Sequence, residues 1–72
     1  MTSRDTIEVQ VNGEERQIPR GLSVYRLLER FELNPALVVV ELNREILDRD
    51  RYDEVEVEEE DTLELVHFVG GG

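Results

Sequence analysis

Apolar and polar residues alternate along residues 7–11 with the period of a β-strand that has one buried face. Asn12 and Gly13 follow directly, and this dipeptide favours a tight type I′ hairpin turn because both residues tolerate positive φ angles. A second strand would run back from the turn and pair Ile18 with Ile7. The start of the chain therefore predicts a β-hairpin with one apolar face.

Residues 22–31 repeat apolar side chains with the period of an α-helix. Ser23 is a suitable N-cap, because its hydroxyl can accept a hydrogen bond from a free N–H of the first turn. Asn34 and Pro35 end the helix. In so small a chain, we expect the apolar stripe of this helix to cover the sheet rather than to bind a partner. The stripe consists of Val24, Leu27, Leu28 and Phe31.

The second half of the chain predicts several short extended segments. Residues 37–42 are apolar on both faces for most of their length, which suits a central strand. Asn43 indicates a turn, and residues 46–47 form a short return strand. Residues 48–51 are charged and indicate a solvated loop or a single helical turn. In residues 55–57, valines alternate with glutamate, which predicts a short strand with an acidic outer face.

Leu63 and Leu65 alternate with polar residues and begin a final strand. The elements then follow in the order strand, strand, helix, strand, short strand and strand, which lays one helix across a small mixed sheet. A right-handed crossover makes the first and last strands parallel neighbours. We expect an α+β, ubiquitin-like β-grasp domain over residues 1–69, with a mixed four- to five-stranded sheet covered by one helix, and a flexible glycine tail over residues 70–72.

The chain of 72 residues carries eighteen acidic residues against eight arginines and no lysine, a net charge of −10. This charge repels phosphate backbones and anionic lipids, so we expect neither nucleic acid nor a membrane as a partner. It favours encounter with a basic protein surface. No apolar run approaches a membrane span and the first residues do not resemble a signal peptide, so we expect a cytoplasmic protein that is monomeric when free.

Residues that could support catalysis or metal binding are few. The chain has no cysteine, which excludes disulfides, thiolate metal sites and a thiol nucleophile. His67 is the only histidine and has no evident ligand set, so we expect it to pack or to contact a partner. The acidic residues 54–61 lack the spacing and central glycine of a calcium loop and predict a solvated face. We predict no catalytic residue and no metal site in this chain.

The last strand leads into three glycines, and we interpret the carboxylate of Gly72 as the reactive group. Gly70 and Gly71 have no Cβ, so a tail that contains them can enter a narrow channel of a partner. A carboxylate is a poor electrophile, and converting it to an acyl phosphate anhydride supplies the leaving group that it lacks. The pattern therefore predicts a carboxylate that a partner activates.

A partner must also recognise the body of the domain. If the leucines of the last strand face the helix, Val66 and Phe68 face the other way and are exposed. Together with Val39 and Val69 they would form an apolar patch, and such patches on small proteins usually mark a partner site. The alternative is that Phe68 folds over the sheet edge and completes the core.

The segment VHFVGGG at residues 66–72, after a hairpin, helix and strand, resembles the ThiS family, the sulfur carrier protein of thiamine thiazole synthesis. Residues 39–46 resemble its third strand and turn, residues 51–52 its basic residue near an aromatic, and residues 61–65 the approach to its final strand. One departure is the acidic turn 59–61, which lacks the glycine commonly found there.

This resemblance implies a carrier that is a co-substrate rather than an enzyme and binds no cofactor itself. An E1-like adenylating enzyme would use Mg-ATP to adenylate Gly72, a sulfur donor system would replace AMP and leave a thiocarboxylate, and a thiazole synthase would take the sulfur. Three alternatives stay open: a carrier like the small subunit of molybdopterin synthase, a ubiquitin-like protein modifier, and a scaffold or interaction module with an inert tail. The absence of lysine excludes only isopeptide chains that this protein builds on itself.

Overall fold

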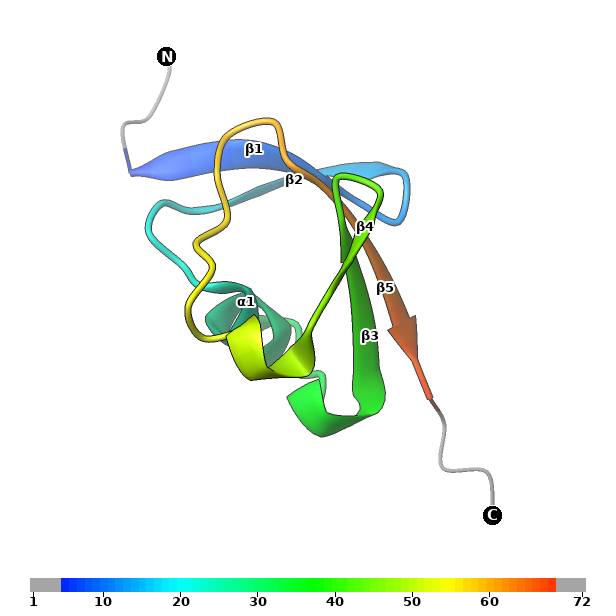
Figure 1. The fold of residues 1–72 in the computed structure, drawn as a ribbon. Coiled ribbons are helices and arrows are strands. Elements are labelled where there is room, and N and C mark those ends of the chain that lie inside the picture. The colour runs from blue at the N-terminus through cyan, green and yellow to red at the C-terminus, as the bar shows by residue number, and fades with distance from the viewer. Residues whose placement is uncertain (1–4, 69–72) are drawn as a thin grey trace.

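A five-stranded mixed sheet with one α-helix across one face makes up residues 5–68, the part of the chain that the computed structural model describes (Figure 1). The strands lie in the order β2-β1-β5-β3-β4. β1 and β5 are parallel, and the other neighbours are antiparallel. The β-grasp prediction is confirmed. The elements are β1 (Thr6–Val11), β2 (Glu14–Pro19), α1 (Val24–Arg30), β3 (Val38–Leu42), β4 (Glu45–Leu47), β5 (Thr62–His67) and the 3₁₀ helices Pro35–Leu37 and Arg49–Arg51.

The hairpin of β1 and β2 forms as its turn residues predict. Asn12 and Gly13 have φ angles of 52° and 83°, the left-handed values that a type I′ turn requires. Ile7 lies opposite Ile18, and both side chains are buried. The turn chemistry and the apolar pattern therefore select the same register.

Helix α1 covers the inner face of the sheet. The hydroxyl of Ser23 accepts a hydrogen bond from the backbone N–H of Arg26 at 3.1 Å, which confirms the predicted N-cap. The first three residues of the predicted stripe are fully buried, and Phe31 packs against the core from its margin. The stripe is thus core. The buried set is Ile7, Val9, Val11, Ile18, Val24, Leu27, Leu28, Val38, Val40, Tyr52, Val57 and Leu63.

Tyr52 is a core residue that the hydrophobic pattern did not indicate. Its side chain is 2% exposed, and its hydroxyl donates to the carbonyl of Val38 at 2.8 Å and accepts from the N–H of Val40 at 3.2 Å. β4 ends at Leu47, opposite Val40, and does not reach Val38. The phenol therefore satisfies two backbone groups that would otherwise be buried without a partner.

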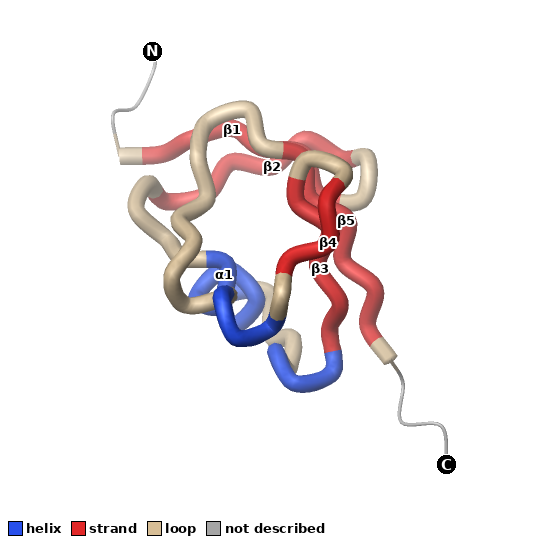
Figure 2. Tube along the Cα trace, in the orientation of Figure 1, coloured by secondary structure: helices blue, strands red, loops and turns tan. Residues whose placement is uncertain are grey.

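Residues 55–57 do not form the predicted strand. Glu56 makes only an isolated bridge with Ser23, and the segment between the second 3₁₀ helix and β5 runs as loop (Figure 2). The N–H of Val24 donates to Val55, and the N–H of Val57 donates to Leu22, each at 2.9 Å. The alternating pattern correctly indicated a buried side chain, because Val57 lies in the core. The segment bonds to the start of α1, however, and does not join the sheet.

Two further findings concern the place of β3 in the sheet and the turn before β5. β3 is an interior strand as expected, although β5 holds the middle of the sheet. The turn before β5 adopts a left-handed conformation at Glu60, with φ 69°, where glycine would be unstrained. The N–H of Glu60 donates to the carbonyl of Glu8 at 2.8 Å, which ties this turn to β1.

Candidate functional site

The residues predicted to carry the chemistry fall outside the described part of the chain. Gly70, Gly71 and Gly72, as well as Val69, lie beyond residue 68, so their roles stay predictions. The structure does place the other three residues of the predicted partner site. These are Val39, Val66 and Phe68.

β5 alternates between the two faces of the sheet as its sequence predicts. Leu63 is fully buried under α1, whereas Val66 and Phe68 are each 54% exposed on the outer face. The alternative in which Phe68 completes the core is therefore wrong. An apolar side chain left more than half exposed on each of two outward positions indicates a surface that another molecule covers.

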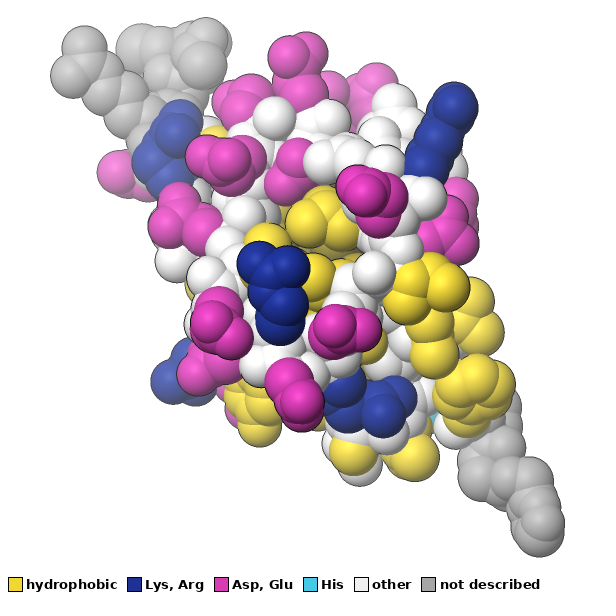
Figure 3. Space-filling view, viewed as in Figure 1, with side chains coloured by type: hydrophobic (Ala, Val, Ile, Leu, Met, Phe, Trp, Pro, Cys, Tyr) yellow, Lys and Arg dark blue, Asp and Glu magenta, His cyan; other side chains and the backbone are white. Residues whose placement is uncertain are grey.

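Neighbouring strands extend this exposed surface. Val39 lies directly opposite Val66 in the β3–β5 ladder, and its side chain is partly buried. Ile46 of β4 is 73% exposed and pairs with Glu41 of β3. Glu41 lies two residues after Val39, so Ile46 and Val39 are on the same face of the sheet. We call Val39, Ile46, Val66 and Phe68 the outer apolar patch. Hydrophobic side chains gather on the side of the molecule where β4 and β5 lie (Figure 3).

Ile46 was missed as a site residue, although a signal for it existed. A two-residue turn at Asn43 and Arg44, whose φ angles are 50° and 72°, sets the pairing of Glu41 with Ile46. Leu37, 40% exposed, was also missed; its carbonyl accepts from the N–H of Phe68 at 2.8 Å. It thus lies at the border of the patch.

Acidic residues supply the charge on the rest of the outer face. The charged residues at outward positions of the described strands are all glutamates, namely Glu8, Glu15, Glu41 and Glu64. Glu41 and Glu64 stand directly opposite one another. Like charges at such a pair destabilise a sheet, so this arrangement suits a face that meets cations on a partner.

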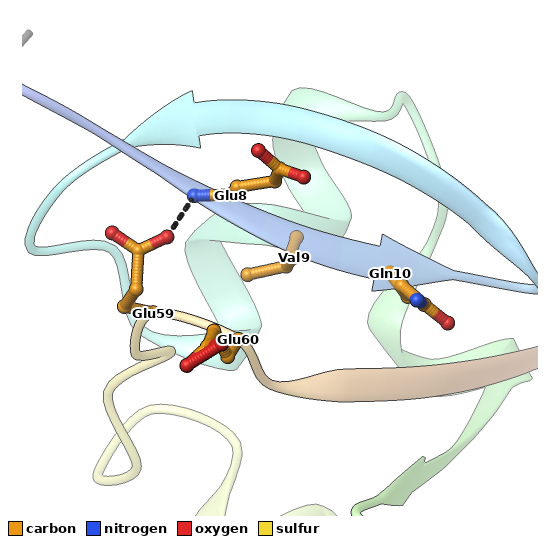
Figure 4. Close-up of a pocket in the computed structure, with 5 residues that line it drawn as sticks. All are labelled: Glu8, Val9, Gln10, Glu59 and Glu60. Atoms are coloured by element: carbon orange, nitrogen blue, oxygen red, sulfur yellow. Dashed lines mark hydrogen bonds between the residues drawn. The ribbon is translucent and has the colours of Figure 1, made fainter. Parts of the chain in front are cut away.

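A shallow hollow of about 450 Å³ lies at the acidic end of this face, where β1 meets the turn before β5 (Figure 4). A carboxylate oxygen of Glu59 accepts from the backbone N–H of Glu8 at 2.8 Å. A hydrogen bond with the Glu15 side chain, reinforced by the charges of Glu15, Glu59 and Glu60, raises the pKa of Glu8. The hollow is therefore a negatively charged surface feature.

Over residues 5–68 the structure forms no cluster of His, Cys, Asp or Glu suited to a metal ion. His67 stands at the end of β5, opposite Val38, and is exposed. Of the two alternatives expected for His67, packing does not fit this exposure, and a contact with a partner stays a prediction. In the same described range, α1 is far too short to cross a membrane, and no other helix could.

Known proteins resemble this chain along almost its whole length. The profile of the ThiS family matches residues 9–72. The sulfur carrier protein ThiS of Bacillus subtilis is 40% identical over 65 residues, which cover 89% of this chain and 98% of that protein. The crystal structure of the thiamine biosynthesis protein ThiS from Geobacter metallireducens superposes with a TM-score of 0.79 at 33% identity and covers 92% of this chain and all of that one.

Part of a larger protein is similar as well. The thiazole synthase of Magnetococcus marinus is 35% identical over 66 residues. These residues are 92% of this chain but only 20% of that synthase. The similarity therefore concerns one small region of the synthase and not its whole length.

Proposed function

The chain belongs to the ThiS family, and from this premise we propose that it is a sulfur carrier of thiamine biosynthesis that holds sulfur as a thiocarboxylate on Gly72. The family match over residues 9–72 is the observation that carries the proposal, because it includes the glycines as well as the body. The protein then acts as a co-substrate of other enzymes. ATP and Mg²⁺ belong to the activating partner in the cytoplasm, and the carrier itself holds no cofactor.

The proposed chemistry proceeds in steps that partners catalyse. A carboxylate oxygen of Gly72 attacks the α-phosphorus of ATP, and pyrophosphate leaves. The terminal sulfur of a persulfide then attacks the acyl carbon and displaces AMP, and a thiol of the donor system cleaves the resulting S–S bond to leave the thiocarboxylate. Its sulfur is a better nucleophile than the original oxygen. A thiazole synthase is the proposed acceptor, and the similarity to part of such a synthase supports this choice.

The outer apolar patch gives the body a means to offset the ordering of the tail. Fixing residues 70–72 in a channel costs roughly 1–2 kcal/mol per residue, or about 3–6 kcal/mol in all. Covering the exposed parts of four apolar side chains contributes about 1 kcal/mol each. The two quantities are of the same order, so a partner that binds the patch can hold the tail without a very large interface.

The partner surface follows from the chemistry of the outer face. It should present apolar side chains opposite Val66 and Phe68 and arginine or lysine opposite Glu41 and Glu64. The adenylating enzyme and the thiazole synthase would then use the same face in turn, and each would release the carrier before the other binds.

Intact mass spectrometry tests the proposal. The full chain is incubated with an E1-like enzyme of the ThiS pathway, Mg-ATP and a persulfide donor. The expected mass increase equals the difference between sulfur and oxygen, and it should be absent without ATP and in a variant that lacks Gly72. An unchanged mass would refute the proposal, and covalent adducts with other proteins would favour a modifier instead.

A further inference from the structure

The two sides of β5 are held by different numbers of main-chain partners. β3 pairs with β5 from Leu63 as far as His67. β1 pairs with it only at Thr62 and Leu63, because β1 ends at Val11 and the chain turns away into the hairpin. The backbone pairing between β1 and β5 therefore ends at Leu63, whereas β5 continues to His67.

Beyond this point the side chain of Asn12 bonds to the backbone of β5 in place of β1. Its Oδ1 accepts from the N–H of Leu65 at 2.7 Å, and its Nδ2 donates to the carbonyl of Leu65 at 3.3 Å. Its own backbone N–H donates to the carbonyl of Leu63 at 2.9 Å. A carboxamide has the same donor and acceptor as a peptide group, so Asn12 continues the ladder by one step.

We propose that Asn12 is a positioning residue for the activation of Gly72 and that it acts through Leu65. The proposal rests on the proposed function, because it assumes that an enzyme must receive the chain beyond β5. Leu65 is the last residue of β5 that the β1 side holds, so Asn12 fixes the second edge of the strand, whereas β3 fixes the first edge as far as His67. A preordered strand lowers the entropy that is lost when the partner binds.

A second turn asparagine provides a matched control. Asn43 also has a left-handed φ angle, 50°, and its Oδ1 accepts from the N–H of Thr62 at 2.9 Å. Its Nδ2 donates to a carboxylate oxygen of Asp61 at 3.0 Å. Asn43 thus holds the first residue of β5 with the same chemical group, but at the end of the strand remote from Gly72.

The test compares Asn12→Gly with Asn43→Gly in the full chain. Glycine keeps the left-handed turn and removes the carboxamide, and its added backbone freedom is common to both variants. We expect Asn12→Gly to accelerate amide exchange of Leu65 about tenfold relative to Asn43→Gly, as the loss of two hydrogen bonds implies. In ATP–pyrophosphate exchange with the E1-like enzyme, KM for the carrier should rise several-fold in Asn12→Gly alone, while kcat is unchanged.

Asn12→Asp adds a second variant that keeps the turn. Its carboxylate still accepts from the N–H of Leu65 but cannot donate to the carbonyl, so exchange and KM should lie between those of the wild type and Asn12→Gly. Unchanged exchange at Leu65, or an equal rise of KM in Asn43→Gly, would overturn the proposal. A wild-type chain that gains no sulfur would instead refute the proposed function, and the exchange data would still decide whether Asn12 holds β5.

Discussion

Replacing Ile46 with threonine tests whether the outer apolar patch binds a partner. Threonine keeps the branched Cβ and the preference for strands, so the change removes apolar surface with little effect on the backbone. Ile46 is 73% exposed in the free protein. Most of the surface that the substitution removes is therefore available to a partner rather than to the core.

The magnitude follows from this exposure. Fully burying an isoleucine contributes about 1.5–3 kcal/mol. With three quarters of the side chain available, binding should lose about 1–2 kcal/mol, so Kd should weaken about 5- to 30-fold. The quarter that is already covered limits the loss in the free energy of unfolding to about 0.5 kcal/mol.

Isothermal titration of the carrier into the E1-like enzyme without ATP measures the change in Kd. Urea unfolding measures the loss in the free energy of unfolding. Tyr25→Ala on α1 is the control, because Tyr25 is an exposed large side chain, 37%, on an element that covers the other face of the sheet. Its Kd should match that of the wild type. A Kd for Ile46→Thr within twofold of the wild type, or an equal loss in both variants, would refute docking through this patch.

Three further changes probe the body and the patch. Phe68→Asp should weaken binding more than Ile46→Thr and lower Tm little, and a large fall in Tm by calorimetry would place the ring in the core after all. Tyr52→Phe should lower the free energy of unfolding by about 2–3 kcal/mol in urea titrations, because two buried backbone groups of β3 lose their partner; a loss below about 0.5 kcal/mol would contradict that role. The raised pKa of Glu8 means that its contribution to stability is present at acid pH and lost as the pH rises, so Glu8→Gln should raise Tm at neutral pH, and this gain should vanish toward acid pH.

The sequence predicted those parts of the fold that depend on neighbours along the chain. The hairpin follows from Asn12 and Gly13, and the helix start follows from Ser23, because in each case a few adjacent residues fix the backbone. The parallel contact of β1 and β5 followed from the handedness of the crossover. The exposure of Val66 and Phe68 followed from alternation alone.

The features that escaped prediction depend on contacts distant in sequence. Residues 55–57 alternate as a strand does, but their partner is the start of α1, which no local pattern reveals. Tyr52 lies in the core, where its hydroxyl bonds to the backbone of Val38 and Val40, which are 14 and 12 positions away in the sequence. Ile46 is the exception: it was missed although a local two-residue turn sets its pairing with Glu41.

Several features that are unfavourable in a stable sheet lie on the outer face of this molecule. The inner face is well satisfied, since no buried side-chain polar atom of residues 5–68 lacks a partner. The outer face and its margin hold the opposed pair Glu41 and Glu64, the left-handed Glu60, and exposed apolar side chains such as Ile46. Such conflicts are typical of functional sites. A partner with apolar and cationic groups would relieve both the repulsion and the exposure, so binding at the outer face would add stability that the free carrier lacks.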